Sequence, residues 1–287
     1  MSGDWLYLLV PDIFCLKCRI ADESRMDAIR KFIVGENNFR AQTPWGGWAA
    51  FFMSVGFFVF QVLAAIVVGG AVVLWLHGVE IFAGNPSPEE IKSFIDIGIF
   101  TALASYILTF GLILLVGGSR NGSIGDVLLL KMPVKPIANI VFGIAIVAVF
   151  FIGFSYIIEN FFPRDGVESE AQMKQIFGLI GESNLLWAGV AVIVLGAPFV
   201  EEAIFRGFLL TSFSKTRLGF WGAAVLSSAL WAAIHGYAVS MAVGLFVFGL
   251  LLSLLVRRTG SIWISILLHA LWNAGVTAAI FVAMKAG

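Results

Sequence analysis

Long apolar runs separated by short polar segments dominate the chain from residue 45 onward. A helix needs about 20 apolar residues, at a rise of about 1.5 Å each, to cross the hydrocarbon core of a bilayer. The runs that reach or approach this length are about 47–76, 97–118, 137–158, 185–213, 218–234, 239–256 and 261–284. They predict an all-α polytopic membrane bundle of about seven transmembrane helices, and a break in the long first run would make eight.

Composition favours a membrane protein over a soluble domain. Of the 287 residues, 60% are hydrophobic and 13% are charged, whereas soluble domains have roughly 45–50% and 25%. Lysine plus arginine and aspartate plus glutamate each number 18, so the net charge is zero. Nothing in this balance indicates a nucleic-acid partner.

The first 44 residues differ from the rest because they carry six basic and six acidic side chains and no spanning run. We expect residues 1–44 to form a cytosolic or interfacial region, in which 21–34 fits an amphipathic helix. Cys15 and Cys18 form a lone CxxC without a second pair or a nearby histidine. Two reduced thiols are therefore expected, with no role that the sequence reveals.

The segments between the runs give the orientation. Basic residues gather before the first run and in the second, fourth and sixth loops: Arg25, Arg30, Lys31, Arg40, Arg120, Lys131, Lys135, Lys215, Arg217, Arg257 and Arg258. The positive-inside rule makes these segments cytosolic. The N-terminus is then cytosolic, and seven helices would place the C-terminus outside. The acidic stretch 159–184 is interpreted as an outer loop.

Ionisable side chains are confined to the later runs. The runs 97–118 and 137–158 contain no Asp, Glu, Lys, Arg or His, and the first run has none before His77. The candidates in or at the ends of the later runs are Glu201, Glu202, Arg206, His235 and His269. A charge at the bilayer centre costs about 2.5–3.5 kcal/mol on insertion scales, so such groups usually face a bundle interior or a watery cavity. Chemistry or transport is therefore expected after residue 185.

Helix geometry divides the charges in the stretch EEAIFR, residues 201–206. Glu202 and Arg206 are four residues apart, share a helix face and can form a structural ion pair. Glu201 is rotated about 100° from Glu202 and has no partner on its own helix, so it is the free carboxylate. Pro198 removes the backbone hydrogen bond to Val194 and can kink the helix just before the two acids.

Two more motifs follow. Trp231 and His235 are four apart in WAAIH, and His269 and Asn273 are four apart in HALWN. Each group alone also has a structural explanation, such as an ion pair, a histidine at a helix end or interhelical hydrogen bonds. The ionisable side chains within apolar runs all lie in the second half of the chain. This concentration favours one site to which they all belong.

The three motifs resemble those of the type II CAAX prenyl proteases and their prokaryotic relatives, the CAAX protease and bacteriocin-processing (CPBP, ABI) family of intramembrane glutamate proteases. That family carries EExxxR, an aromatic residue four before a histidine, and HxxxN or HxxxD on successive helices. Here they stand in the same order over about residues 185–280, with 34 positions from Glu201 to His235 and 34 from His235 to His269. Trp231 departs from the usual phenylalanine but keeps its bulk.

The resemblance implies an intramembrane endopeptidase with its site in a cavity that opens toward the cytosol. Hydrolysis without a metal is expected from the residues, since there is no HExxH and Asn273 is a poor zinc ligand. The implied site residues are Glu201 and His235 for activating a water, His269 and Asn273 for stabilising the oxyanion, and Glu202 and Arg206 as support. This agrees with the needs of peptide hydrolysis, which requires a base beside a water and donors aimed at the oxyanion.

The resemblance also implies a division of the chain into two membrane regions and a cellular location. Residues 185–287 would form the catalytic core, and residues 45–184 would form accessory helices one to three with their loops. The expected location is a prokaryotic cell membrane, and the expected partners are the lipid bilayer and a membrane-associated protein or peptide substrate, lipidated or not. No cofactor is expected, and the identity of the substrate is not readable from the sequence.

Three alternatives stay open from the residues alone. Two histidines with one or two glutamates could bind a catalytic zinc, although there is no HExxH and Asn273 is a poor zinc ligand. Intramembrane Glu and His also occur in transporters, although no repeat or pair of broken helices is evident here. A non-catalytic immunity scaffold would keep the fold without the chemistry. Ser227 and Ser228 have no assignable base and are expected to serve in packing.

The positions of these residues along their helices place them at different depths in the membrane, which is a problem if they form a single site. Counted at about 1.5 Å per residue, Glu201 and His269 lie roughly 12–18 Å from the cytosolic ends of their helices, whereas His235 lies about 25 Å along its own. These side chains can meet only if the helix 218–234 is tilted, short or set deep.

Overall fold

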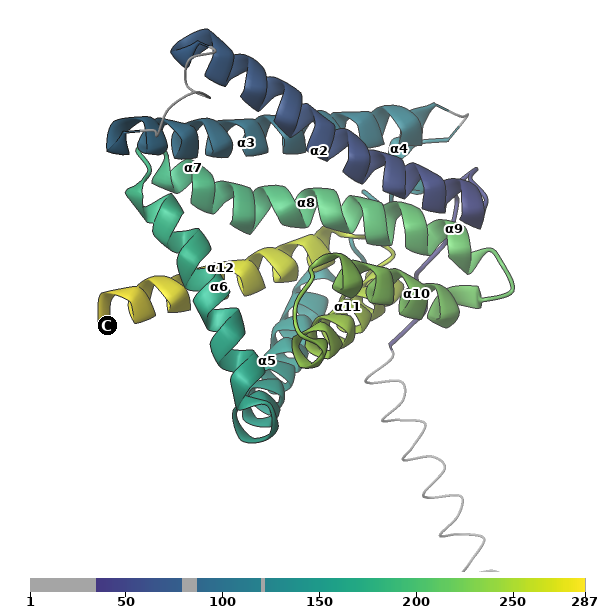
Figure 1. Ribbon diagram of the computed structural model, residues 1–287. Helices are drawn as coiled ribbons and strands as arrows, with labels where there is room; N and C mark the ends of the chain where they lie inside the picture. Colours follow the sequence, from purple (N-terminus) through teal and green to yellow (C-terminus); the bar gives the residue numbers. More distant parts are fainter. Residues whose placement is uncertain (1–34, 79–86, 120–121, 287) are drawn as a thin grey trace, which may run out of the picture.

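The computed structural model describes residues 35–78, 87–119 and 122–286 (Figure 1). Within these residues all regular structure is helical. The expectations for Cys15, Cys18 and the helix at 21–34 lie outside the described residues.

The helices follow one another with short connections. In chain order they are α2 (Gly47–His77), α3 (Pro88–Gly118), α4 (Ile124–Val127), α5 (Pro136–Phe161), α6 (Pro163–Glu182), α7 (Leu186–Ala191), η2 (Val192–Gly196), α8 (Ala197–Glu202), η3 (Ala203–Leu210), α9 (Thr211–Ser214), α10 (Gly219–Ile234), α11 (Val239–Thr259) and α12 (Trp263–Ala286). The segments η2 and η3 are π-helical, and α7 to α9 form one continuous rod of residues 186–214.

Every apolar run predicted from the sequence is helical, which confirms the all-α polytopic membrane fold. Among the described residues, six helices are long and apolar enough to cross a membrane, the rod 186–214 being one of them. The exception among the seven runs is α10, whose 16 residues measure about 24 Å. His235 is the C-cap at the far end of this helix and still lines the same cavity as Glu201 and His269, so the three side chains do meet.

The interpretation of residues 159–184 as a loop was wrong, because most of this stretch is the helix α6. Its charged residues hide a helical pattern in which Ser169, Met173 and Phe177 recur at intervals of four and line one side. The second run also begins earlier than predicted, at Pro88. Ser87 and Glu90 form a capping box there, and the charged first turns carried no apolar signal.

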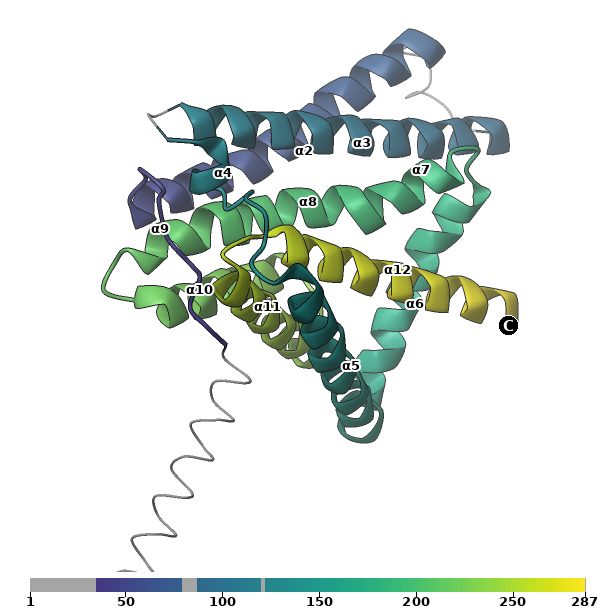
Figure 2. The ribbon, with the colours of Figure 1, turned by 180° about the vertical axis from the view of Figure 1, so that it is seen from behind.

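The helices surround the rod α7–α9. Figures 1 and 2 show α2 and α3 against one side of the rod and α12 on the other side. The pair α10 and α11 packs beside the second half of the rod, and α5 packs on α11. Helix α6 runs obliquely from the end of α5 to the start of α7 and contacts α12. The two motif-bearing glutamates therefore lie on the central element of the bundle.

The core of the bundle is built around the second half of the rod. All eight residues of η3 are buried, and they pack with buried apolar side chains of α10, α11 and α12. The serines Ser227 and Ser228 on α10 are fully buried there. The Ser227 hydroxyl donates to the Phe205 carbonyl oxygen at 2.7 Å, in keeping with the packing role expected for it.

Candidate active site

Adjacent carboxylates on α8 face opposite environments. Glu202 is completely buried, whereas the Glu201 side chain is 14% exposed and lines a cavity. The difference follows from their rotation of about 100° around the helix axis. As the sequence predicted, Glu202 pairs with Arg206 on its own helix and Glu201 has no partner there.

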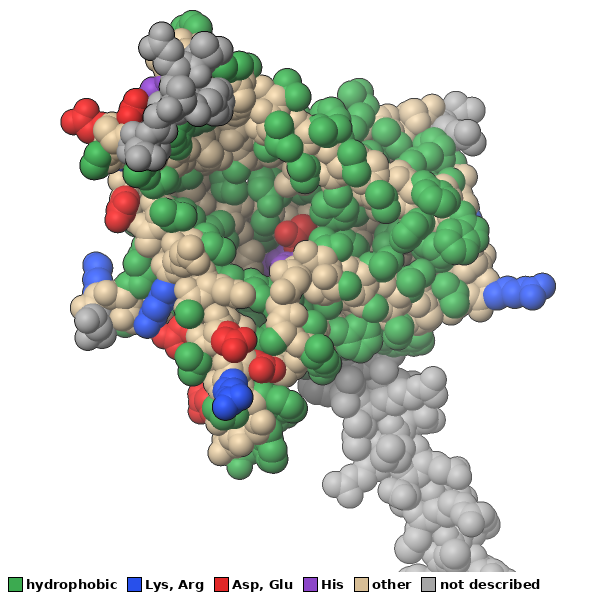
Figure 3. All heavy atoms as spheres, viewed as in Figure 1, with side chains coloured by type: hydrophobic (Ala, Val, Ile, Leu, Met, Phe, Trp, Pro, Cys, Tyr) green, Lys and Arg blue, Asp and Glu red, His purple; other side chains and the backbone are tan. Residues whose placement is uncertain are grey.

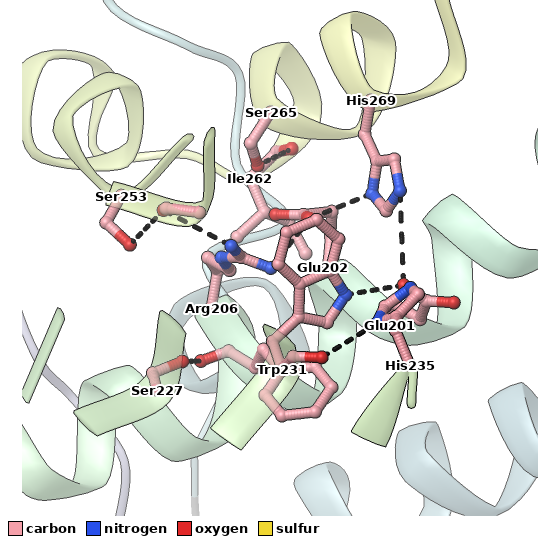
Figure 4. Close-up of polar contacts among 12 residues, drawn as sticks. Glu201, Glu202, Arg206, Ser227, Trp231, His235, Ser253, Ile262, Ser265 and His269 are labelled. Carbon is pink, nitrogen blue, oxygen red and sulfur yellow. Dashed lines mark hydrogen bonds and ion pairs between the residues drawn. The ribbon is translucent and has the colours of Figure 1, made fainter. Parts of the chain in front are cut away.

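Glu202 is the centre of a buried charge cluster (Figure 4). Its Oε1 atom accepts hydrogen bonds from Arg206 Nη1 at 3.0 Å and from His269 Nδ1 at 3.1 Å. Arg206 is also completely buried, and its Nη2 donates to the Gly249 carbonyl oxygen at 3.2 Å. Breaking such a pair leaves an uncompensated buried charge, so each member needs the other.

Gly249 makes this cluster possible. A Cβ atom at this position would lie 2.9 Å from Arg206 Nη2 and 2.9 Å from the Ser228 side chain. Only a glycine lets the backbone of α11 approach the guanidinium closely enough to accept its hydrogen bond. No pattern in the sequence indicated that Arg206 has a partner on α11.

His269 connects the buried cluster to the cavity. The Glu202 carboxylate can only accept a hydrogen bond, so we assign a proton to Nδ1 of His269. The other ring nitrogen, Nε2, lies 3.9 Å from Glu201 Oε2. In the neutral ring Nε2 is an acceptor, and it becomes a donor only when the ring carries both protons. Glu202 therefore orients His269 as well as pairing with Arg206.

Glu201 has a partner that the sequence analysis missed. The indole Nε1 of Trp231 on α10 donates to Glu201 Oε2 at 2.6 Å (Figure 4). Tryptophan has one N–H donor, which phenylalanine lacks. The spacing of Trp231 and His235 placed both on one helix face, but nothing in the sequence identified the acceptor.

His235 is held by the end of its own helix. Its Nδ1 lies 2.7 Å from the carbonyl oxygen of Trp231, one of the last carbonyls of α10. The Nδ1 proton is assigned to this bond, which leaves Nε2 as an acceptor in the neutral ring. The ring of Tyr237 stacks on it with centroids 5.9 Å apart. His235 therefore has one nitrogen that is free for chemistry.

Asn273 is fixed by an irregularity of the rod. In a π-helical turn the Ile193 carbonyl would accept from residue 198, five positions on, but Pro198 has no N–H. Asn273 Nδ2 on α12 donates to this carbonyl oxygen at 2.9 Å instead. Pro198 thus leaves the Ile193 carbonyl without its backbone donor, and this carbonyl binds Asn273 instead. The second Nδ2 hydrogen is not used by this bond.

A cavity of about 390 Å³ joins these groups. Glu201, Trp231, His235, His269 and Asn273 all line it. Its remaining lining is mostly apolar and includes residues of α5, α6 and α11. Figure 3 shows a hollow in this face of the molecule, with acidic and histidine surface at its floor between apolar walls.

Tyrosines in the lining were also missed by the sequence analysis. Tyr106 on α3 and Tyr237 in the connection between α10 and α11 both line the cavity. Burial, with the charge of Glu201 added to it, raises the pKa of the Tyr237 phenol, which stays a donor at neutral pH. Its hydroxyl lies 4.0 Å from Met173 Sδ on α6, so it joins this helix to the cavity rim.

The predicted site residues are thus brought together from three helices. Glu201, His235, His269 and Asn273 surround the cavity, and Glu202 and Arg206 lie buried behind it. In the part of the chain that the structure describes, no three His, Cys, Asp or Glu side chains are grouped so that they could hold a metal ion.

A family model matches the part of the chain that carries these residues. The model of the Rce1-like type II CAAX prenyl endopeptidases matches residues 183–275, a segment that contains all six predicted site residues. The match confirms the family resemblance for this segment and indicates a membrane protease. No curated protein and no solved structure gives a significant match to the chain.

Proposed function

We propose that this membrane protease hydrolyses a peptide bond within a membrane-associated protein or peptide, lipidated or not, by means of a water that Glu201 and His235 activate. The observation that carries the proposal is the cavity itself. It is lined by the carboxylate of Glu201, by two histidines with one available nitrogen each and by an amide, from helices that are far apart in sequence.

In the proposed reaction a water beside Glu201 and His235 attacks the peptide carbonyl carbon. Glu201 takes the proton from the water as the new carbon–oxygen bond forms. The tetrahedral intermediate then breaks its carbon–nitrogen bond, and the proton passes to the leaving amine. Neutral Nε2 of His235 can share the proton because Nδ1 is held by the Trp231 carbonyl.

The developing oxyanion needs donors, and two are proposed. Asn273 supplies the Nδ2 hydrogen that Ile193 does not use. His269 supplies Nε2–H when its ring carries both protons, with Glu202 holding the Nδ1 proton in place. Preorganised donors of this kind are each worth about 10²–10³ in rate. Glu202 and Arg206 are proposed to support the site by fixing His269.

The proposed hydrolysis is independent of metal. Support comes from the donor set, because Asn273 is a poor metal ligand and the described residues include no group of three suited side chains. Chelator treatment is expected to leave activity intact. Inhibition by a chelator, restored by zinc, together with stoichiometric metal in the pure protein, would replace this proposal with a zinc-dependent one.

The deciding experiment is cleavage of a peptide or proteome library by the protein in lipid vesicles. Glu201→Ala, His235→Ala and His269→Ala are each expected to abolish hydrolysis while the unfolding transition stays cooperative. The control is Glu170→Ala, which removes an exposed carboxylate of α6 and is expected to cleave at the wild-type rate. Full activity in Glu201→Ala would overturn the mechanism.

A further inference from the structure

Trp231 makes more contacts with the groups around the cavity than the proposed mechanism requires. It is the largest of the fully buried side chains, with 1% of its surface exposed. Its indole N–H reaches Glu201 Oε2 at 2.6 Å, a short bond typical of an ionised acceptor. Filling space alone would not require the single N–H donor of Trp231 to bond with Glu201.

We propose that Trp231 is the positioning residue of the water-activating pair. This inference rests on the proposed function, since it takes Glu201 and His235 as that pair. The indole N–H fixes Oε2 of Glu201, and Oε1, for which the described residues provide no hydrogen-bond donor, is left to receive the proton from water. The carboxylate is thereby held in one orientation.

The main chain of the same residue holds the other member of the pair. The Trp231 carbonyl oxygen lies 2.7 Å from His235 Nδ1, which turns Nε2 away from the helix end. One residue therefore fixes Glu201 through its side chain and His235 through its backbone. The distance between the two groups is set by Trp231 and not by two independent loops, which is the kind of preorganisation that catalysis requires.

The rest of the indole is locked in place by the groups behind the cavity. The Arg206 guanidinium lies 4.8 Å from the ring centroid, as a cation over an aromatic face. The rings of His235 and His269 approach it edge to face, with centroids 5.0 Å and 5.3 Å away. The indole therefore has no freedom to turn its N–H away from Glu201.

Trp231→Phe removes the N–H group but keeps an aromatic ring and the backbone carbonyl that holds His235. We expect kcat to fall roughly 10- to 100-fold, the usual value of a hydrogen bond to a charged group. KM should stay within about twofold, because the bond acts on the base and not on the substrate. The matched control is Trp263→Phe, which loses an indole bond to the Leu130 carbonyl outside the cavity and should keep the wild-type kcat.

A second measurement does not depend on hydrolysis. In protein labelled with ¹⁵N-tryptophan, the indole resonance of Trp231 is identified by its absence in Trp231→Phe. We expect it to lie downfield, as a strong hydrogen bond requires, and to move upfield in Glu201→Ala, whereas the resonance of Trp263 stays in place. A Trp231 resonance that Glu201→Ala leaves unmoved would overturn the inference, whatever the kinetics of Trp231→Phe.

The kinetic outcomes separate this inference from the proposed function. An active Glu201→Ala variant would remove the proposed function. An inactive Glu201→Ala together with a wild-type kcat in Trp231→Phe would leave the function standing and overturn the role of Trp231. A rise in KM with unchanged kcat in Trp231→Phe would make Trp231 a substrate contact, which also contradicts positioning.

Discussion

Helices α2 and α11 are equally apolar, and yet they occupy opposite environments. Both have a mean hydropathy of 2.6 in their most apolar window, but 6% of that window is buried in α2 and 44% in α11. The rod 186–214 has a lower hydropathy, 1.8, and is also 44% buried. Apolar character therefore places a helix in the membrane without deciding whether it faces lipid or protein.

Small and polar residues determine whether a helix packs inside the protein. Lipid tails are as apolar as leucine, so helices associate in membranes through close packing and hydrogen bonds. The buried face of α11 includes Gly244, Gly249 and Ser253, and the rod contributes Glu202 and Arg206 to the centre. The four buried residues of α2 lie near its N-terminal end, and beyond them one side of the helix packs on α3 while most of its other side chains are exposed. The comparison predicts that equal changes will have unequal effects in the two regions.

The largest contrast is expected for ion pairs. Arg206→Ala leaves Glu202 unpaired at a completely buried position and should destabilise the protein by about 3–5 kcal/mol. The control is Lys174→Ala on α6, which breaks a pair of the same i,i+4 spacing with Glu170 at exposed positions and should cost at most about 0.5 kcal/mol. Unfolding in mixed micelles measures both. Unchanged stability with lost hydrolysis in Arg206→Ala would make Arg206 a residue of the reaction instead.

A smaller contrast is expected for apolar side chains. Leu252 on α11 is completely buried, and Leu252→Ala should cost about 2–5 kcal/mol because it leaves a cavity. Leu115 on α3 is 73% exposed, and Leu115→Ala should change the free energy of unfolding by less than about 1 kcal/mol, since lipid fills the space. Equal losses in the two variants would show that the exposed face of α3 is covered by protein in the membrane.

Much of the fold was predictable because each feature depends on a local pattern. Apolar runs identified the seven helices, and helix rotation separated Glu201 from Glu202. Helix α6 was missed because its charges lower the apolar signal, and its apolar residues show as a stripe only at a period of about four. The orientation in the membrane, the division into an accessory and a core region, and the prokaryotic location stay predictions.

The motifs predicted which residues would lie together, but not which partners they would bond to. The motif spacing placed His269 and Asn273 on one face, and both line the cavity. Their partners could not be inferred, because the bonds from His269 to Glu202 and from Asn273 to Ile193 join residues 67 and 80 positions apart. The same holds for the indole bond of Trp231. One-dimensional spacing shows which residues share a helix face, and only the packing of helices shows what that face contacts.

Glycines in α2 and α11 can be compared in the same way. An added methyl group should change the free energy of unfolding in opposite directions in the two helices. Gly249→Ala on α11 places a Cβ 2.9 Å from Arg206 Nη2 and from Ser228, so the buried cluster must shift, at a cost of about 1–3 kcal/mol. Gly56→Ala on α2 meets nothing within 4 Å and should stabilise the helix by up to about 1 kcal/mol. Unfolding in mixed micelles measures both variants, and hydrolysis should fall only in Gly249→Ala, since the shift reaches Glu202 and His269. A neutral Gly249→Ala would mean that the cluster around Arg206 can move freely, and the contrast between the two regions would then be one of lipid exposure alone.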